Sequence, residues 1–467
     1  MIKDPVELPV GTVEWIESVT AESVASLHRH VARREAWVVE MESDCTDKKS
    51  YFLRIDRAGA KGHGGPWSLL RETKIIQALA ATDVPAQKII AWHDEFHLAL
   101  QEMVVGDSEL DQVDRPQQHA VMMNFMAALA ELHRLEPRAL GLSEYCPWPE
   151  SAEQQALSEV YVIESLWRTM PAPPSAGRLF SAFGKRWLEN HVPPHYQHTV
   201  LVQGDTGPAN FMFDGDKISA SVDWELAHFG DPMEDLGNIV VRDYFYPSSG
   251  GDLQPYFSHY EQLSGIPFDV EKVKYYTVQQ LLRSVMSLMY SVPSLKWNDE
   301  VAMNMGYEIN CQRAMCDAIA RAMAVSCPAD PMPVSVVQRG DEDQEVGRVF
   351  SIIEQQLQQQ ILPAQSDHFI THRVEHIHAM VEFMHRKARY GSLLDRYELN
   401  EIADMMGESF DDLPMAEEAL LARIDTMDSV EEEQIILTYL HARAYRLEDL
   451  MEPLVRPFAH RFLAEVD

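Results

Sequence analysis

The sequence predicts an α+β protein in three parts: an antiparallel sheet near the amino terminus, a larger and mainly helical part, and an all-helical carboxy-terminal domain. Strand-like runs are concentrated in about the first hundred residues, and helical apolar spacing dominates the remainder. A proline-rich stretch separates the last helical segment from the rest. With 467 residues the chain is too long for one ordinary hydrophobic core, which agrees with a division into domains.

Residues 1–105 are expected to carry the sheet. Runs rich in β-branched and aromatic residues, separated by polar turns, are typical of paired strands. These runs cover residues 36–42, 49–55, 88–93 and 97–104. Apolar residues recur at helical spacing over residues 68–81, and Val84-Pro85 ends that pattern.

Residues 106–327 are expected to be mainly helical, with short strands near residues 201–224. The predicted helices are residues 117–134, 152–168, 177–191, 254–263, 270–289 and 299–325. Proline density then marks residues 328–345 as a linker. Residues 346–467 are helical in pattern and strongly acidic, and they are long enough to fold as a separate domain.

The composition limits the environment and the partners of the protein. The five cysteines are scattered without a Cys-x-x-Cys pair, which argues against a zinc centre or a disulfide framework and fits a reducing cytoplasm. No apolar run is long enough to span a bilayer, and the first residues lack a basic segment followed by an apolar one. A net charge of −34 opposes binding to nucleic acid. A cytoplasmic, soluble protein without nucleic-acid or membrane partners is therefore expected.

Three polar residues carry the strongest functional signal. Asp205 and Asn210 are five residues apart in a predicted loop, and Asp223 follows the next apolar run. Phosphoryl transfer needs a carboxylate to orient the acceptor hydroxyl and oxygen ligands to hold Mg²⁺ on the phosphates, and these side chains supply both. Gly, Asp and Asn are also ordinary turn residues, so the spacing alone leaves a purely structural interpretation open.

The longer stretch 201–236 favours a catalytic interpretation of these residues over a purely structural one. It continues through Asp223-Trp224-Glu225, Gly230-Asp231-Pro232 and Asp235-Leu236. In this form it resembles the signature of the aminoglycoside phosphotransferase-like family of small-molecule kinases, which is related to choline kinases and protein kinases.

This resemblance implies a bilobal protein-kinase-like fold, with an N-lobe at residues 1–105 and a C-lobe at residues 106–327. It implies Asp205 as the catalytic aspartate, Asn210 and Asp223 as Mg²⁺ ligands, and ATP or GTP as the phosphoryl donor. One position departs from the pattern, because the family often has His where this chain has Gln203.

Residues of the amino-terminal part resemble the nucleotide site of the family. Arg54 occupies the strand position where kinases carry a phosphate-binding lysine, and an acyl-CoA-dehydrogenase-associated branch often has Arg there. Glu72 matches the helix glutamate that pairs with that cation; the alternative for Arg54 and Glu72 is an exposed pair that contributes little. Glu102 and Val104 fall in the segment that resembles the adenine-binding hinge.

The loop expected to cover the phosphates is unusual. Residues 30–37 contain no glycine, although kinases use glycines there to bring backbone N–H groups to the nucleotide. Arg33 and Arg34 would replace those contacts with charged ones, or the loop has lost that role. In the second case the chain would be a pseudokinase that serves as a binding scaffold.

The carboxy-terminal part bears on the acceptor. Its helical segments between Phe350 and Leu421 resemble a small companion protein of a phosphotransferase that acts on 4-hydroxyacyl-CoA in bacterial levulinate breakdown. The resemblance implies a hydroxyacyl-CoA as acceptor, a CoA ester that local Lys and Arg would have to bind. Another alcohol, a sugar or an aminoglycoside-like molecule is the alternative. The helices could equally form a generic acidic bundle that supports homo-oligomerisation.

Two further motifs are expected to be structural. Leu132-His133 is interpreted as a packing element of its helix. His372 and His376 are four residues apart, a spacing that suits a metal, but no third ligand is evident. A solvated helix face is therefore the preferred interpretation of the two histidines.

Overall fold

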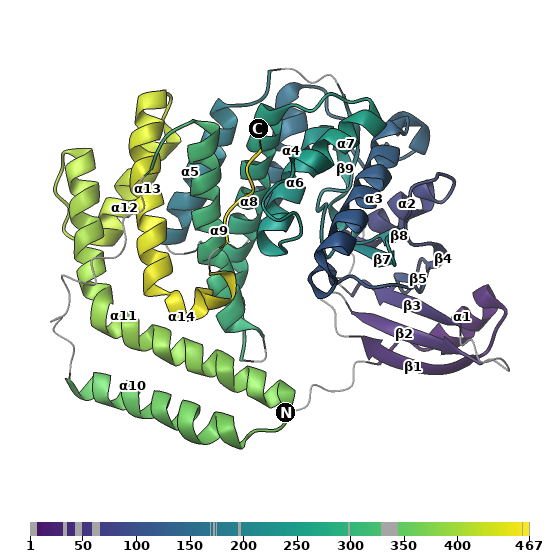
Figure 1. Ribbon diagram of the computed structural model, residues 1–467, viewed down its shortest axis with the longest axis horizontal. Coiled ribbons are helices and arrows are strands. Elements are labelled where there is room, and N and C mark those ends of the chain that lie inside the picture. Colours follow the sequence, from purple (N-terminus) through teal and green to yellow (C-terminus); the bar gives the residue numbers. More distant parts are fainter. Residues whose placement is uncertain are drawn as a thin grey trace. The chain divides into compact units, whose positions relative to one another are not determined.

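The computed structural model of the chain describes residues 7–30, 35–42, 49–57, 66–168, 170, 173, 175–194, 198–297, 299–327, 344–459 and 461–466 (Figure 1). The chain divides into two compact units. The first comprises Met1–Ser151, Tyr196–Asp269 and Ala464–Asp467, and the second comprises Ala152–His195 and Val270–Leu463. Arg33 and Arg34, predicted to contact phosphates, lie outside the described residues, as does nearly all of the predicted linker.

A five-stranded antiparallel sheet lies in the first unit (Figure 1). Its spatial order is β1-β2-β3-β5-β4, with β1 at Val24–His30, β2 at Ala36–Met41, β3 at Ser50–Ile55, β4 at Ile89–His93 and β5 at Leu98–Glu102. The four strands predicted from the sequence are confirmed. Strand β1 and helix α1 (Thr12–Thr20) were not predicted, because no β1 side chain is fully buried and its exposure does not alternate.

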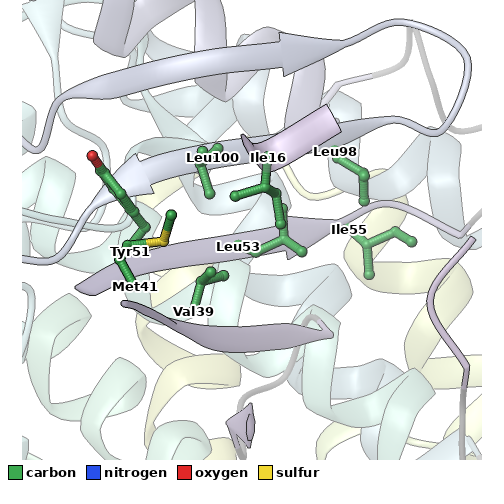
Figure 2. Packing of buried hydrophobic residues seen from close by; sticks show 8 residues of the cluster. All are labelled: Ile16, Val39, Met41, Tyr51, Leu53, Ile55, Leu98 and Leu100. Atoms are coloured by element: carbon green, nitrogen blue, oxygen red, sulfur yellow. The ribbon is translucent and has the colours of Figure 1, made fainter. Parts of the chain in front are cut away.

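The two faces of the sheet have different surroundings. One face packs against α1 and forms a buried core of Ile16, Val39, Met41, Tyr51, Leu53, Ile55, Leu98 and Leu100 (Figure 2). Successive side chains of a strand point to opposite faces. Phe52 and Arg54 of β3 and Gln101 of β5 therefore lie on the other face, where they line a cavity.

Helix α2 (Leu69–Leu79) confirms the predicted helix after β3 and contacts β4 and β5. The hydroxyl of Ser68 caps it by accepting a hydrogen bond from the backbone N–H of Arg71 at 3.3 Å. The cap fixes the first turn of the helix. Arg71 and Glu72 lie on that turn, and both are buried.

The remainder of the first unit combines helices with two short strand pairs. It contains α3 (Arg115–Arg134), β6 (Val200–Val202), β7 (Phe211–Asp214), β8 (Lys217–Ser221), β9 (His228–Gly230), α6 (Pro232–Phe245) and α7 (Gln254–Ser264). Strand β6 pairs with β9, and β7 pairs with β8, both antiparallel. Helix α6, which is buried on nearly all its faces, was not predicted from the sequence.

The second unit is helical. Its main helices are α4 (Ala152–Trp167), α5 (Ser175–Asn190), α8 (Val270–Ser291), α9 (Val301–Ala322), α10 (Gln344–Gln356), α11 (His368–Met406), α12 (Leu413–Asp425), α13 (Val430–Leu450) and α14 (Glu452–Val455). The predicted helices of this region are confirmed. Residues after 344 share a buried core with α9, made of Ala302, Phe383, Tyr390, Leu394, Leu450 and Leu454.

This packing gives a partition that differs from the predicted boundaries at residues 105, 327 and 345. Helices α12 and α13 contact α5 and α9, so the carboxy-terminal helices and the earlier ones belong to one compact unit. A Cβ at Gly306 of α9 would lie 2.2 Å from the carbonyl oxygen of Leu454, which shows how closely α9 and α14 approach. The predicted four-part division remains a prediction about independently folding domains.

The expected α+β architecture is confirmed, with an antiparallel sheet in the amino-terminal part and mainly helices in the parts that follow. Among the helices that the structure describes, none combines the length and the apolar character needed to cross a membrane.

Candidate active site

Glycines shape the loop that carries Asp205 and Asn210. The loop follows β6, and Gly204 within it has φ +81°; a Cβ there would lie 2.4 Å from the carbonyl oxygen of Leu226. Gly207 has φ +137°, and a Cβ there would lie 2.7 Å from Cβ of Arg242. Both the backbone conformation and the close packing therefore require glycine at these two positions.

The carboxylate of Asp205 is held through one of its two oxygens. Oδ2 accepts hydrogen bonds from Nδ2 of Asn210 at 2.7 Å and from Nη2 of Arg242 at 2.9 Å. Nδ2 of Asn210 also donates to the backbone oxygen of Asp205 at 2.7 Å. Oδ1 accepts no hydrogen bond from the described part of the chain, and the Asp205 side chain is 23% exposed. Asp205 therefore has a fixed orientation and one carboxylate oxygen available to a ligand.

Asp235, on the first turn of α6, holds the loop that carries Asp205 through several hydrogen bonds. Its carboxylate accepts hydrogen bonds from the backbone N–H groups of Gln203 at 2.9 Å and Gly204 at 3.0 Å, and from the hydroxyl of Thr206. Nε2 of His133 lies 3.0 Å from Oδ2 of Asp235. Complete burial raises the pKa of Asp235, but these hydrogen bonds and the His133 charge outweigh it and lower the pKa below its usual value.

His133 is structural, and its contribution is a hydrogen-bond network rather than packing alone. Nδ1 lies 2.7 Å from the hydroxyl of Tyr260 on α7, while Nε2 faces Asp235. His133, Asp235 and Tyr260 are all buried. The network thus connects α3, α6 and α7 to the loop that carries Asp205.

The two predicted metal ligands flank the same end of the β7–β8 hairpin. Phe211 is paired with Ser221, and one step further the N–H of Val222 donates to the backbone oxygen of Asn210 at 2.9 Å. Asp223 follows directly, in the left-handed region at φ 59° and ψ 62°. The hairpin register therefore brings Asn210 and Asp223 into proximity, as two oxygen-bearing side chains at one edge.

Gln203, which stands where the family often has His, makes a local side-chain hydrogen bond. Nε2 of Gln203 donates to the backbone oxygen of Val222 at 2.7 Å. This bond ties the start of the Asp205 loop to the residue that precedes Asp223. The substitution therefore keeps the two segments connected.

Arg54 and Glu72 form a buried ion pair. Nη1 of Arg54 lies 2.5 Å from Oε1 of Glu72, and the two side chains are 13% and 0% exposed. The alternative of an exposed surface pair is therefore wrong. The pair joins β3 to α2 on the cavity side of the sheet.

Arg71 connects α2 to the segment after Asp223. Its guanidinium donates to the backbone oxygens of Tyr145 at 3.0 Å and Glu225 at 2.9 Å, and to the backbone oxygen of Ala227. Arg71 is 7% exposed. All three acceptors are neutral backbone carbonyl groups, so their dipoles stabilise the positive charge of Arg71.

A cavity of about 370 Å³ lies on the open face of the sheet. It is lined by His30, Ala36, Phe52, Arg54, Gln87, Gln101, Glu102, Met103, Val104, Met212, Val222, Asp223 and Glu225. Four predicted site residues, Arg54, Glu102, Val104 and Asp223, thus share one cavity. Asp205, Asn210 and Glu72 are not among its lining residues; Glu72 is connected to it through Arg54 and Asn210 through the hairpin end.

Arg242 and Arg71 were not predicted as site residues. Arg242 lies on α6 seven residues after Asp235, which is two helical turns, so both side chains face the same loop. That spacing is the one sequence signal that could have indicated it. Arg71 binds backbone atoms far along the chain and leaves no such pattern.

A family model described as the phosphotransferase enzyme family matches residues 42–276, half of the chain. The chain belongs to this phosphotransferase family. The matched region of the phosphotransferase includes Arg54, Glu72, Asp205, Asn210 and Asp223, so the residues described above lie inside the part that defines the family. The resemblance to small-molecule kinases is thereby confirmed.

The phosphotransferase has curated relatives of greater length. It is 26% identical to acyl-CoA dehydrogenase family member 11 of Rattus norvegicus over 244 residues, which are 49% of this chain and 29% of that protein. It is 24% identical to acyl-CoA dehydrogenase family member 10 of Mus musculus over 245 residues, which are 50% of this chain and 21% of that protein. The chain thus spans less than a third of the length of these relatives.

Among solved structures, the phosphotransferase is similar to a candidate aminoglycoside phosphotransferase from Ralstonia eutropha. The TM-score is 0.52 at 19% identity, over 67% of this chain and 97% of that one. This similarity supports the protein-kinase-like fold expected from the sequence.

Proposed function

We propose that this phosphotransferase transfers the terminal phosphoryl group of ATP, in the presence of Mg²⁺, to a hydroxyl group of a small molecule. The observation that carries the proposal is the arrangement around the cavity. Arg54 and Asp223 line it, and Asp205 is held by Asn210 and Arg242 with one carboxylate oxygen available.

The residues present fit a nucleotide. The cavity of about 370 Å³ is within the range of small-molecule sites, roughly 300–1,000 Å³. Ala36, Met103 and Met212 give it apolar walls that suit a planar base, and Arg54 is the single Arg or Lys among the described lining residues. A guanidinium held by Glu72 presents a fixed fork to phosphate oxygens. Glu102 and Val104 would contact the base, and GTP remains the alternative donor.

The residues also fit a divalent cation. Both side-chain hydrogen bonds of Asn210 use Nδ2, so Oδ1 of this amide is the atom that would face a metal, and the Asp223 carboxylate would be the second ligand. Mg²⁺ favours oxygen ligands of this kind. Bound there, it would neutralise charge on the phosphates.

The chain's own residues then account for positioning and proton transfer. Oδ1 of Asp205 would accept a hydrogen bond from the acceptor hydroxyl and take its proton as the hydroxyl oxygen bonds to the terminal phosphorus atom. The bond from that phosphorus to the bridging oxygen breaks at the same time, and ADP leaves. Arg242 and Asn210 fix Oδ2 and so set the direction in which Oδ1 points. Asp235 and His133 hold the loop that carries this carboxylate.

For the acceptor, we propose a hydroxyacyl-CoA. Support comes from the names of the curated relatives, which are acyl-CoA dehydrogenase family members. The resemblance of the carboxy-terminal helices to the companion of a 4-hydroxyacyl-CoA phosphotransferase adds to it. Another alcohol, a sugar or an aminoglycoside-like molecule is the alternative acceptor within the same chemistry.

The test is incubation of the protein with Mg²⁺-ATP and a panel of hydroxyacyl-CoAs, sugars and aminoglycosides, followed by mass spectrometry for one added phosphate. We expect the added phosphate on a hydroxyacyl-CoA, and we expect Asp205→Asn to lose it. Asp214→Asn is the matched control, since Asp214 is an exposed aspartate at the end of β7.

The outcomes separate the parts of the proposal. A product on a sugar or aminoglycoside would retain the kinase and replace the acceptor. A rise in melting temperature with Mg²⁺-ATP but no product on any acceptor would indicate a nucleotide-binding scaffold. No thermal response and no product would contradict the kinase proposal itself.

A further inference from the structure

A cluster of two histidines and a glutamate lies in the second unit, apart from the kinase site. His372 and His376 are one turn apart on the same face of α11, and their ring centroids are 4.1 Å apart. Glu300 immediately precedes α9. The sequence offered no third partner for the histidine pair; the fold supplies one from a segment about seventy residues earlier.

The donor atoms of the cluster have the spacing of metal ligands. Oε2 of Glu300 lies 3.4 Å from Nε2 of His372 and 2.8 Å from Nδ1 of His376. All three atoms lie within 4.8 Å of one another. Bonds of about 2.0–2.1 Å around a tetrahedral ion place its ligand atoms roughly 3.4 Å apart. One of these two separations already has that value, and the other requires a small outward movement.

A second residue holds Glu300 in this orientation. Nη1 of Arg373 donates to Oε1 of Glu300 at 2.9 Å, and the same guanidinium donates to the backbone oxygens of Asp299 at 3.1 Å and Trp297 at 3.0 Å. Oε1 is thereby engaged, and Oε2 is the oxygen that faces both imidazoles. Metal-binding carboxylates in proteins are commonly fixed by such an outer hydrogen bond.

The facing atoms are shielded from bulk solvent. Oε2 of Glu300 and Nδ1 of His376 are both buried, and they lie 2.8 Å apart. His372 is 52% exposed, so an ion and a water ligand can reach the cluster from solvent.

From this geometry we propose that Glu300, His372 and His376 bind a divalent transition-metal ion of the zinc type, with solvent at the fourth position. Imidazole with carboxylate suits Zn²⁺ and its neighbours in the series, whereas Mg²⁺ favours oxygen alone. The ion would tie the first turns of α11 to the start of α9. The site is independent of the proposed phosphoryl transfer.

The experiment measures Zn²⁺ binding by calorimetry to the full chain after treatment with a chelator, in excess Mg²⁺. The Mg²⁺ saturates carboxylate-only sites, including the one proposed at Asn210 and Asp223. We expect one equivalent of Zn²⁺ bound by the parent protein and by His378→Ala. His378 is a matched control because it lies on the same helix and faces a single carboxylate, Glu382, at 3.5 Å.

We expect His372→Ala, His376→Ala and the double variant to lose that equivalent, and Glu300→Gln to bind at least tenfold more weakly. Added Co²⁺ should give the visible absorption of a tetrahedral site in the parent and not in the double variant. Melting temperatures measured in the presence of chelator identify any variant that fails to fold. If a histidine variant does not fold, Glu300→Gln, which keeps the side-chain shape, still tests the site. No Zn²⁺ equivalent in the parent, or an unchanged one in the double variant, would overturn the proposal.

Discussion

The guanidinium of Arg242 lies 2.9 Å from Oδ2 of Asp205, so the carboxylate proposed to position the acceptor is itself positioned by a cation from another element. Asn210 donates to the same oxygen. The second oxygen therefore points in a direction set by two donors. This arrangement predicts that turnover depends on residues that would contact neither nucleotide nor acceptor.

Replacement of Arg242 by Met should lower kcat while the KM for ATP stays nearly constant. A hydrogen bond to a charged group contributes about 1.5–3 kcal/mol, which corresponds to about tenfold or more in rate. Steady-state kinetics would measure this, with whichever acceptor gains a phosphate in the mass-spectrometry test. Arg134→Met is the control, because Arg134 is a partly exposed arginine of the same unit that pairs with Glu131. An unchanged kcat in Arg242→Met would remove Arg242 from the positioning of Asp205.

Asp223→Ala should weaken Mg²⁺-dependent binding of ATP more than Asn210→Ala does. Asp223 would bring a full negative charge to the cation, whereas the Asn210 amide would bring only a dipole. Calorimetry of ATP with and without Mg²⁺ gives the Mg²⁺-dependent part for each variant. If Asp223→Ala retained the full Mg²⁺ dependence, another residue would have to hold the metal.

Arg54→Lys should weaken ATP binding by about tenfold without a large loss of stability. Lys keeps the charge beside Glu72 but not the planar fork. Arg54→Met is a harsher change, because Glu72 is fully buried and loses the cation at 2.5 Å; removal of one partner of such a pair costs about 3–5 kcal/mol. Thermal-shift titration with Mg²⁺-ATP separates the two effects. Equal ATP affinity in parent and Arg54→Lys would mean that Arg54 does not contact the phosphates.

Asp235 should make stability sensitive to acid. Its pKa is lowered in the folded state, so its stabilising contribution is fully present above about pH 4 and is lost as the pH falls through the folded-state pKa. Asp235→Asn should be less stable than the parent at pH 7, and the difference should shrink below pH 4. Chemical unfolding at several pH values measures it. A difference that stays constant down to pH 2 would contradict the ionised, hydrogen-bonded carboxylate.

Glu308 on α9 should have the opposite pH dependence. Burial raises its pKa to about 7, against an ordinary value of 4.5. The folded state therefore binds this proton more tightly than the unfolded chain, and the contribution present below about pH 4.5 is lost as the pH rises through 7. Glu308→Gln should raise stability relative to the parent at pH 8 but not at pH 4.5, by about 3 kcal/mol at most. Chemical unfolding of the parent and of Glu308→Gln at pH 4.5 and pH 8 measures the difference, and equal stabilities at pH 8 would contradict the raised pKa of Glu308.

Local sequence patterns predicted the elements well where the period was clean. Strands β2 and β3 lie in runs rich in β-branched and aromatic residues, and the apolar residues of helix α2 recur at every third or fourth position. Helix α6, which is buried on nearly every face, and strand β1, which is largely exposed, were not predicted.

The motif around Asp205 and Asp223 was readable because its members are close in sequence. Arg71 acts on backbone oxygens 74 to 156 residues away, and Arg242 reaches Asp205 across 37 residues. No local period encodes such contacts. The position of Glu300 beside His372 and His376 depends in the same way on how α9 and α11 pack.

The three backbone acceptors of Arg71 have a mechanical meaning. If helix α2 shifted along its axis, the segment after Asp223 would have to move with it. Otherwise the Arg71 guanidinium would lose its hydrogen bonds to the backbone oxygens. Glu72, the residue after Arg71, forms an ion pair with Arg54. A shift of helix α2 would therefore also displace Arg54, the proposed phosphate-binding cation. The phosphate-binding side and the metal-binding side of the cavity should therefore form together or be lost together. The site would then have two states, and its two sides would not adjust independently.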